Sequence, residues 1–536
     1  MNDRAESAPG PDPEQAGRGP TGYGSGSFGP TGAGPVRSGP AGSAGTGPTE
    51  PEPSAGPEPS AGPESDGSGA TGSQPAAGAV PDSDSGAGAD TAAATAQGAG
   101  PAGPGRLWSV DEHLADILAS VHPLEPIELQ LPDAQGCVLV EDVTVPVALP
   151  PFDNSSMDGY AVRTADVSGA TAEFPAVLTV IGDVAAGSGA LPEVGPGEAA
   201  RIMTGAPLPP GAEAVVPVEW TDGGSGGGAA TMMHPAAATG RDGASGEVRV
   251  FRSAEARAHV RPRGSDVQAG DLALKAGTVL GPPQIGLLAA IGRGRVRVRP
   301  RPRVVVLSTG SELVQPDEQL NEGQIYDSNS FALTAAAREA GAIAYRVGAV
   351  TDDAETLRAT IEDQLIRADM VVTTGGVSVG AYDVVKEALS SVGDEDEPGS
   401  GIDFRTLAMQ PGKPQGFGSI GPEHTPLLAL PGNPVSSYVS FELFVRPAIR
   451  ALMGRTDLHR PTVRARIEAE RPLSSPAGRR QFLRATYDEE TGTAAPVGGA
   501  GSHLVAALAQ ADALIVVPEN TVSVEPGAEV DVILIG

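Results

Sequence analysis

The chain has 536 residues and a formal net charge of −31, from 67 acidic and 36 basic side chains. This length indicates several domains, and the acidic surplus argues against general binding of nucleic acid or anionic membranes, which requires a basic face. The one cysteine, Cys137, excludes an internal disulfide framework, and no apolar run is long enough to span a membrane, so we expect a cytoplasmic protein.

The N-terminal segment, residues 1–105, consists almost wholly of Gly, Pro, Ala, Ser and Thr, with 12 acidic and 3 basic side chains. Such a segment cannot bury enough apolar surface to offset the entropy lost on ordering, so we predict a disordered acidic tail. A Gly-rich island at 222–247 has the same character and is predicted to be a long loop between two strands.

An elongated N-terminal region, residues 106–299, follows the tail. It opens with a predicted helix that begins after the N-cap candidate Ser109 and is stopped by Pro123, with apolar residues at helical spacing. From about 150 to 260, short β-branched runs such as AVLTVIGDV and AVVPVEW are separated by Gly and Pro, which indicates an inserted β-rich domain.

Residues 300–456 alternate apolar strands with helices. The strands are RVVVLSTG, AIAYRVGAV, DMVVTTGG and PLLALPGN, and of the helices between them one closes at Gly341 and the next is capped by Asp352. This alternation is typical of a parallel sheet covered on both faces, with ligands at the carboxyl ends of its strands. Strands return over residues 459–536, which predicts a C-terminal β-barrel or sandwich. The predicted fold class is multidomain α/β plus β.

Two of the predicted α/β strands end in glycine turns. One turn, STGSEL, starts at Ser308, and the other, TTGGVSVGAYD, starts at Thr373. Gly375 and Gly376 have no Cβ where the backbone would approach a ligand, and N–H groups at the start of the following helix favour a phosphate or another oxyanion. The glycines could also serve only the turn from strand to helix, but two such loops on one sheet edge favour a ligand site.

Carboxylates lie beside both loops in the sequence: Glu312, Asp327 in GQIYDSNS, and Asp383. Several carboxylates next to an anion would be explained by a divalent cation that bridges them to phosphate oxygens. Asp383 could equally be a helix cap. Lys413 in MQPGKP and the turn LPGNPVSS complete the candidate edge, although a single Lys is often only a solvated surface residue.

A third motif, PPFDNSSMDGYAVR at 150–163, places Ser156 and Asp158 in a loop bounded by Pro and Gly. Turn chemistry alone would account for it, and the same holds for Thr204 in RIMTGAPLPPGAEAVVPVE. The seven histidines show no metal-ligand spacing, so we expect no zinc site.

These motifs occur together and in order. They are PPFDNSSMDGYAVR, RIMTGAPLPPGAEAVVPVE, STGSEL, GQIYDSNS, TTGGVSVGAYDVVKEAL, MQPGKPQGFG and LPGNPVSSYVSFELFVRPAIRALMG. From about residue 107 to 536 the chain resembles the molybdopterin molybdenumtransferases, the enzyme family that includes the E domain of gephyrin. One Gly-rich loop is a weak signal, but seven matching segments are very specific.

The resemblance implies the last step of molybdenum cofactor synthesis. In that step adenylylated molybdopterin reacts with molybdate in the presence of Mg²⁺, and AMP is released as the metal enters the dithiolene. The resemblance also implies a homodimer whose cleft lies between the α/β domain of one subunit and the β domain of the other. It suggests molybdopterin adenylyltransferase as a protein partner. Neither nucleic acid nor a membrane is expected as a partner.

Carried over position by position, the resemblance implies site residues on both sides of that cleft. Four carboxylates would be catalytic, and the last three of them would also contact the metal: Asp158, Glu312, Asp327 and Asp383. Substrate contacts would come from Thr204, Asp266, Ser308, Thr373, Gly375, Gly376, Ser378, Lys413, Ser436 and Ser437. Asp158, Ser156 and Thr204 would approach from the partner subunit, and the segment HVRPRGSDVQAGD would add Arg261 and Arg263 to Asp266. One departure is Gln410, where many members have lysine.

Two other functions remain open at this point. A molybdopterin adenylyltransferase has a similar α/β domain with a similar TTGG loop, but it lacks the flanking β domains. A non-catalytic scaffold would use the same fold to recruit partners, although four retained carboxylates favour a working site.

Overall fold

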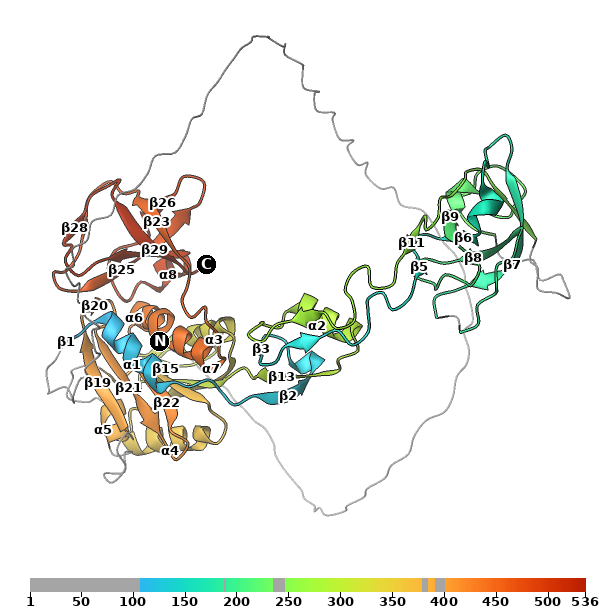
Figure 1. Ribbon diagram of the computed structural model, residues 1–536. Helices are drawn as coiled ribbons and strands as arrows, with labels where there is room; N and C mark the ends of the chain where they lie inside the picture. Colours follow the sequence, from blue (N-terminus) through green and yellow to red (C-terminus); the bar gives the residue numbers. More distant parts are fainter. Residues whose placement is uncertain (1–106, 188, 235–245, 378–383, 391–400) are drawn as a thin grey trace, which may run out of the picture. The chain divides into compact units, whose positions relative to one another are not determined.

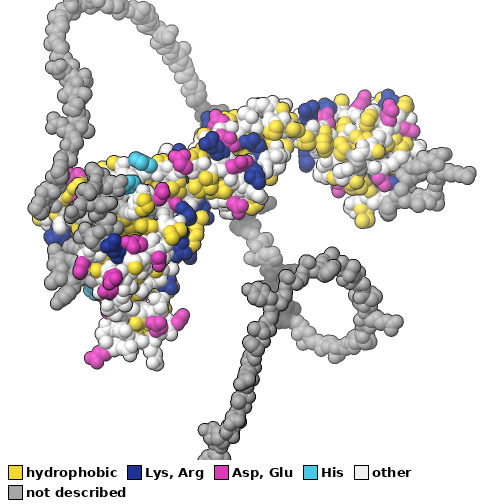
Figure 2. All heavy atoms as spheres, turned by 90° about the horizontal axis from the view of Figure 1, so that it is seen from below, with side chains coloured by type: hydrophobic (Ala, Val, Ile, Leu, Met, Phe, Trp, Pro, Cys, Tyr) yellow, Lys and Arg dark blue, Asp and Glu magenta, His cyan; other side chains and the backbone are white. Residues whose placement is uncertain are grey.

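The computed structural model describes residues 107–187, 189–234, 246–377, 384–390 and 401–536 (Figure 1). The predicted disordered tail and part of the Gly-rich island therefore lie outside the described residues. Among the described residues, none of the helices combines the length and the apolar composition that a membrane span requires. On the face seen in Figure 2, acidic and basic side chains are interspersed over the described residues.

The first helix, α1 (Val110–Ser120), begins where the sequence predicts. Ser109 Oγ accepts a hydrogen bond from the Glu112 amide at 3.1 Å, and Glu112 Oε2 accepts one from the Ser109 amide at 2.9 Å. This reciprocal pair is a capping box, which satisfies two amides that a helix start leaves unpaired. The buried side of α1 includes His113 and Ile117.

The segment that follows α1 forms small sheets before and after the β-rich domain. A three-stranded sheet joins β2 (Ile127–Gln130), β13 (Arg295–Arg299) and β3 (Val138–Leu139), which share an apolar cluster with α2 (Pro282–Ala290). Two-stranded ribbons are formed by β4 (Val143–Thr144) with β12 (Leu272–Leu274), and by β5 (Asn154–Ser155) with β11 (Val260–Arg261).

The inserted β-rich domain is built on a five-stranded sheet in the order β10-β7-β8-β6-β9. Its strands are β6 (Gly159–Val162), β7 (Ala176–Val184), β8 (Glu198–Ile202), β9 (Ala214–Pro217) and β10 (Glu247–Val250). Gly159 is required where β6 passes β9, because a Cβ there would lie 2.9 Å from the Val216 carbonyl carbon and closer still to its oxygen. This sheet confirms the β-rich domain that the sequence predicts.

The α/β domain contains a seven-stranded sheet in the order β1-β19-β21-β22-β18-β14-β17. Its strands are β1 (Leu107–Trp108), β14 (Arg303–Thr309), β17 (Ile343–Val350), β18 (Met370–Thr374), β19 (Gly401–Leu407), β21 (Pro414–Ile420) and β22 (Thr425–Leu430). All but β21 run in one direction, whereas β21 is antiparallel to both of its neighbours. The sheet is therefore mixed rather than wholly parallel. The antiparallel strand is not apparent in the sequence because PQGFGSI has two glycines and a proline.

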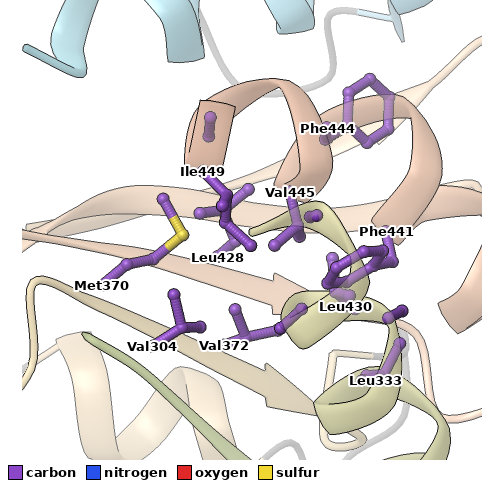
Figure 3. Close-up of a cluster of buried hydrophobic side chains, with 14 of the residues drawn as sticks. Val304, Leu333, Met370, Val372, Leu428, Leu430, Phe441, Phe444, Val445 and Ile449 are labelled. Atoms are coloured by element: carbon purple, nitrogen blue, oxygen red, sulfur yellow. The ribbon is translucent and has the colours of Figure 1, made fainter. Parts of the chain in front are cut away.

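Helices cover both faces of this sheet. They are α3 (Asn329–Ala340), α4 (Ala354–Leu365), α5 (Val384–Ser390), α6 (Pro434–Ser440) and α7 (Arg446–Leu452), with a π-helical turn, Phe441–Val445, between α6 and α7. Met370 and Val372 of β18 pack on one face, toward α3 and α7, and Val371 packs on the other, toward α4 and α5. Figure 3 shows the first face, where Val304, Val372 and Leu428 lie beneath Val445 and Ile449.

Two helix ends test the sequence predictions. Gly341 closes α3 in the left-handed conformation, as predicted. The predicted cap Asp352 is wrong by one residue, because Asp353 is the N-cap of α4 and accepts a hydrogen bond from the Thr356 amide at 2.8 Å. The Asp352 carboxylate instead accepts a hydrogen bond from the Ser311 amide at 2.9 Å.

The C-terminal domain is a small barrel, which confirms the predicted architecture. Its strands are β23 (Thr462–Ile467), β25 (Arg480–Asp488), β26 (Thr493–Pro496), β27 (Ala513–Val517) and β29 (Glu529–Leu534). They follow the order β25-β26-β23-β29-β27, and pairing of β25 with β27 closes the barrel. Shorter elements are β24 (Leu473–Ser474), β28 (Ser523–Val524) and α8 (Val505–Ala509), and β20 (Met409–Gln410) joins the barrel from the α/β domain.

Candidate functional site

Three parallel strands of the α/β sheet end side by side. Ser308 of β14 pairs with Thr374 of β18, and Thr374 pairs with Leu430 of β22. The loops that follow these positions begin with Gly310, Gly375 and the Pro431–Gly432 turn. The sequence-predicted glycine loops therefore meet at the carboxyl edge of the sheet, where open α/β sheets bind ligands.

Gly375 and Gly376 allow the β18 loop to pass close to the β14 loop. Both have positive φ, +102° and +62°. A Cβ on Gly375 would lie 2.7 Å from Thr309 Oγ1 and closer still to the Thr309 carbonyl oxygen, and one on Gly376 would lie 2.5 Å from Val385 Cγ2. The glycines are thus required by contacts within the protein, whether or not a ligand also approaches them.

Two buried hydroxyls lie beside these glycines. Thr309 Oγ1 and Thr373 Oγ1 have no hydrogen-bond partner among the described residues. Two predicted members of the same loop, Ser378 and Asp383, lie outside the described residues. Their predicted contacts with phosphate and metal stay predictions.

Asp327 lies at the same edge and is buried. Asp327 Oδ1 accepts hydrogen bonds from Ser308 Oγ at 2.8 Å and from the Ser330 amide at 3.1 Å, and Oδ2 accepts one from Ser330 Oγ. Arg346 Nη1 lies 3.8 Å from Oδ2. The structure thus brings the predicted residues Asp327 and Ser308 together, with the carboxylate occupied by hydrogen bonds from the start of α3.

A second hydrogen-bond network joins the ends of β18 and β22 through Asn329, at the start of α3. Its amide Nδ2 donates to Thr374 Oγ1 at 3.0 Å and to the Gly432 carbonyl at 2.7 Å. Thr374 Oγ1 also donates to the Pro431 carbonyl at 3.0 Å and lies 2.9 Å from Ser437 Oγ. Sequence reasoning identified Ser437 but missed Asn329, although Asn329 lies in the same GQIYDSNS motif as Asp327.

Glu312 is an exposed carboxylate at this edge. Its loop is tied to the end of β17 by a reciprocal pair, because the Ser311 amide donates to Asp352 at 2.9 Å and the Asp352 amide donates to Ser311 Oγ at 3.1 Å. The Glu312 side chain folds back over Gly310, where a Cβ would lie 2.6 Å from Glu312 Oε2. Beyond it, β15 (Leu313–Val314) pairs in parallel with β16 (Ile325–Tyr326), which leads to Asp327.

The described residues contain no group of three or more His, Cys, Asp or Glu side chains arranged to hold a metal ion. The predicted set of Glu312, Asp327 and Asp383 has one member outside those residues. Its two described members differ, since Glu312 is exposed and Asp327 is buried and hydrogen-bonded.

The predicted anion-contacting residues near β20 and α6 differ in their exposure to solvent. Lys413 is exposed at the start of β21, and its carbonyl accepts from the Leu407 amide at 2.7 Å. Ser436, like Ser437, is buried in the first turn of α6. Gln410 Oε1 accepts from Arg479 Nη1 of the C-terminal domain at 3.4 Å.

In the β-rich domain, Asp158 and Thr204 lie together. Asp158 Oδ1 accepts a hydrogen bond from the Thr204 amide at 2.6 Å, and both residues are exposed. Ser156 is held by its amide, which donates to the His259 carbonyl at 2.9 Å. The exposed apolar side chains Phe152, Met157 and Met203 belong to the same two loops.

The neighbouring loop contains Asp266, Arg261 and Arg263, which are all exposed. Asp153 Oδ1 accepts from the Arg263 amide at 2.7 Å, and Oδ2 accepts from Arg257 Nη2 at 2.9 Å. These two hydrogen bonds lower the pKa of Asp153. Asp153 therefore fixes this loop beside the Asp158 motif, a contact that sequence reasoning did not foresee.

Models of three protein domains match the chain in order. They are the MoeA N-terminal region (domain I and II) over residues 108–292, the probable molybdopterin binding domain over 305–451, and the MoeA C-terminal region (domain IV) over 466–535. The second of these contains the glycine loops and the Asp327 and Asn329 networks.

The chain matches most of the length of its relatives. Molybdopterin molybdenumtransferase 2 of Mycobacterium tuberculosis is 43% identical over 424 residues, which are 79% of this chain and 98% of the relative. The Bacillus subtilis molybdopterin molybdenumtransferase is 34% identical over 76% of this chain and 89% of its own length. The crystal structure of a molybdopterin biosynthesis MoeA protein from Pyrococcus horikosii is 32% identical, with a TM-score of 0.60, and the match covers 80% of this chain and 100% of that one. The chain belongs to the MoeA family of molybdopterin molybdenumtransferases.

Proposed function

We propose that this chain inserts molybdate into adenylylated molybdopterin, with release of AMP, at the carboxyl edge of the α/β sheet. The observation that carries the proposal is the match to a molybdenumtransferase over 98% of that enzyme's length, including both regions that flank the α/β domain. An adenylyltransferase would need only the α/β domain, so the flanking domains favour metal insertion.

The geometry suggests how the chain's own residues would act. The glycine loops after β14 and β18 would bring backbone amides close to the pyrophosphate, because side chains are absent there. Lys413 would add a positive charge, which is scarce in a chain with a net charge of −31. We propose that positioning and electrostatics, rather than a covalent protein nucleophile, drive the reaction as molybdate attacks the phosphoanhydride.

Incubation of the purified protein with adenylylated molybdopterin, Mg²⁺ and molybdate tests this function. AMP and molybdenum cofactor should form together, in equal amounts, and only when molybdate is present. Replacing adenylylated molybdopterin by molybdopterin and ATP is the control for adenylyltransferase activity. Adenylylation in that control, without molybdate-dependent AMP release, would contradict the proposal.

We further propose that Glu312 and Asp383 would hold Mg²⁺ through their carboxylate oxygens, which are the ligand type that Mg²⁺ prefers. The bound ion would neutralise phosphate charge as the anhydride breaks. Both oxygens of Asp327 accept hydrogen bonds from Ser308 and Ser330, and these contacts support a role in orienting Ser308 more than direct coordination.

The exposed carboxylate of Glu312 gives the Mg²⁺ proposal its test. Glu312→Gln should raise the Mg²⁺ concentration for half-maximal turnover by about tenfold, since a carboxylate ligand is replaced by a neutral amide. Glu318→Gln is the matched control, because Glu318 is also exposed and lies in the same connection between β14 and α3. An unchanged Mg²⁺ dependence in Glu312→Gln would exclude Glu312 as a ligand.

We also propose a homodimer in which Asp158, Ser156 and Thr204 of one subunit complete the cleft of the other. The exposed Asp158–Thr204 pair, with Phe152, Met157 and Met203 beside it, supports a contact with another surface. Size-exclusion chromatography with light scattering at micromolar concentration measures the mass directly, and a monomer would contradict the proposal.

A further inference from the structure

The Asn329 side chain links two loops that descend from different strands. Its Nδ2 atom donates to Thr374 Oγ1 at the end of β18 and to the Gly432 carbonyl after β22, at 3.0 and 2.7 Å. Because a carbonyl can only accept, the contact with Gly432 fixes the amide orientation and makes Nδ2 the shared donor. Asn329 is the first residue of α3, so one rigid helix holds both loops.

The Thr374 hydroxyl is the centre of this link. It accepts from Asn329, donates to the Pro431 carbonyl at 3.0 Å and lies 2.9 Å from Ser437 Oγ. Thr374 and Ser437 are buried, whereas Asn329 is half-buried and Gly432 is exposed. A network that is buried on one side and open on the other connects the protein core to the loop backbone at the sheet edge.

We propose that Asn329 is a positioning residue for the nucleotide substrate: it fixes the separation of Gly375–Gly376, which follow β18, from Pro431–Gly432, which follow β22. The inference rests on the proposed function, because it takes the sheet edge as the substrate site. Gly375 directly follows Thr374, and its amide donates to the Leu430 carbonyl at 3.1 Å. The Gly375–Gly376 backbone is thus held from Asn329 on one side and from β22 on the other.

The consequence for the reaction concerns binding more than chemistry. Backbone amides bind phosphate oxygens well only when the loop that presents them is already in place. Loss of the Asn329 link should let the two loops separate in the free enzyme. Ordering them when substrate binds would then reduce the favourable free energy of binding. The Michaelis constant for adenylylated molybdopterin should rise while kcat changes little.

The experiment compares Asn329→Ala and Asn329→Asp with the wild-type full-length enzyme. The Asp variant keeps the size but has no donor for Gly432, so it should resemble the Ala variant or be worse. Both should raise the KM for adenylylated molybdopterin about tenfold, with kcat within about threefold of wild type. Asn321→Ala is the matched control, since Asn321 makes a side-chain hydrogen bond to Gln324 in an exposed turn and should leave KM unchanged.

A second readout separates this inference from the proposed function. Calorimetric titration with AMP alone should show about tenfold weaker binding by both Asn329 variants, and Thr374→Val should reproduce that loss with no further effect when combined with Asn329→Ala. A purely structural role would lower the active fraction, and hence kcat, with KM and AMP affinity unchanged, and would overturn the inference. An inactive wild-type enzyme would overturn the proposed function instead.

Discussion

Asp327 occupies a buried position because its two carboxylate oxygens accept hydrogen bonds from Ser308 and from both the amide and the hydroxyl of Ser330. An asparagine has only one acceptor oxygen, so Asp327→Asn would direct an N–H group at one of these donors. We expect the variant to lose about 1–3 kcal/mol of unfolding free energy. Chemical denaturation measures the loss, and Asp317→Asn, at an exposed position of the same connection, is the control.

His113 gives the fold a pH dependence that can be assigned to one residue. It is buried between Phe417 and Phe444, and Arg405 Nη1 lies 3.2 Å from its Nδ1. Burial and then the charge of Arg405 lower the pKa of His113 from 6.5 to about 3. Because the unfolded chain takes up this proton near pH 6.5 and the folded chain does not, stability is fully present above pH 6.5 and falls as the pH drops toward 3.

This shift should cost about 2 kcal/mol at pH 5 relative to pH 7. Urea denaturation at both pH values, for wild type and for His113→Gln, isolates the effect, because the carboxylates contribute equally to both proteins. The variant will be less stable at pH 7, but its loss between pH 7 and pH 5 should be smaller by about that amount. An identical pH dependence in the two proteins would show that His113 is not the responsible group.

At the scale of single elements, the sequence predicts much of the fold, because capping residues and apolar runs mark where helices and strands lie. Ser109 with Glu112 starts α1, Gly341 ends α3, and apolar runs mark β14, β18 and β22. The antiparallel strand β21 is not predictable in this way, since its glycines and proline lower its strand propensity. Pairing with β19 and β22 and burial of Phe417 and Ile420 stabilise it in the folded sheet.

The candidate site likewise has some features that the sequence predicts and others that it does not. Glycine loops and carboxylates can be identified from residue type, but hydrogen bonds that depend on register, such as Ser308 with Asp327, require the folded sheet. The Asn329 link is of this second kind, because its partners lie 45 and 103 residues further along the chain. The pairing of Asp352 with Ser311 rather than with α4 is another case.

The β18 loop provides a test at the element scale. Gly375→Ala places a Cβ 2.7 Å from Thr309 Oγ1 at a φ of +102°, so the loop must move away from β14. We expect turnover to fall at least tenfold, with a loss of about 1–3 kcal/mol in stability. Gly286→Ala is the control, because Gly286 lies inside α2 with nothing within 4 Å of its Cβ position, and this change should stabilise the protein by up to about 1 kcal/mol.

At the scale of the whole molecule, the tail and the folded domains should be separable. The 1–105 segment has 12 acidic and 3 basic side chains and precedes the first region that matches the family, at residue 108. Deletion of residues 1–105 should therefore leave molybdate-dependent AMP release within about twofold of the full chain. A large loss of turnover in the truncated protein would assign the tail a role in the reaction.

The proposed homodimer makes the sharpest prediction, because its cleft would need residues from two chains. Asp158 lies in the β-rich domain and Glu312 at the edge of the α/β sheet, so Asp158→Ala and Glu312→Ala should each be inactive alone. In a mixed dimer, the intact Asp158 of one chain meets the intact Glu312 of the other at one of the two clefts. Purified mixed dimers should therefore have about half of wild-type turnover, and an unpurified random mixture of equal amounts about a quarter.

Co-expression with two different affinity tags yields the mixed dimers for assay. The control replaces the Glu312→Ala chain by one that carries both substitutions, which leaves no cleft with an intact Asp158 and should restore nothing. If Asp158 instead served the Glu312 of its own chain, mixed dimers would contain only defective clefts and would stay inactive. Turnover in the mixed dimers therefore distinguishes a shared cleft from two independent ones, even where both arrangements have the same molecular mass.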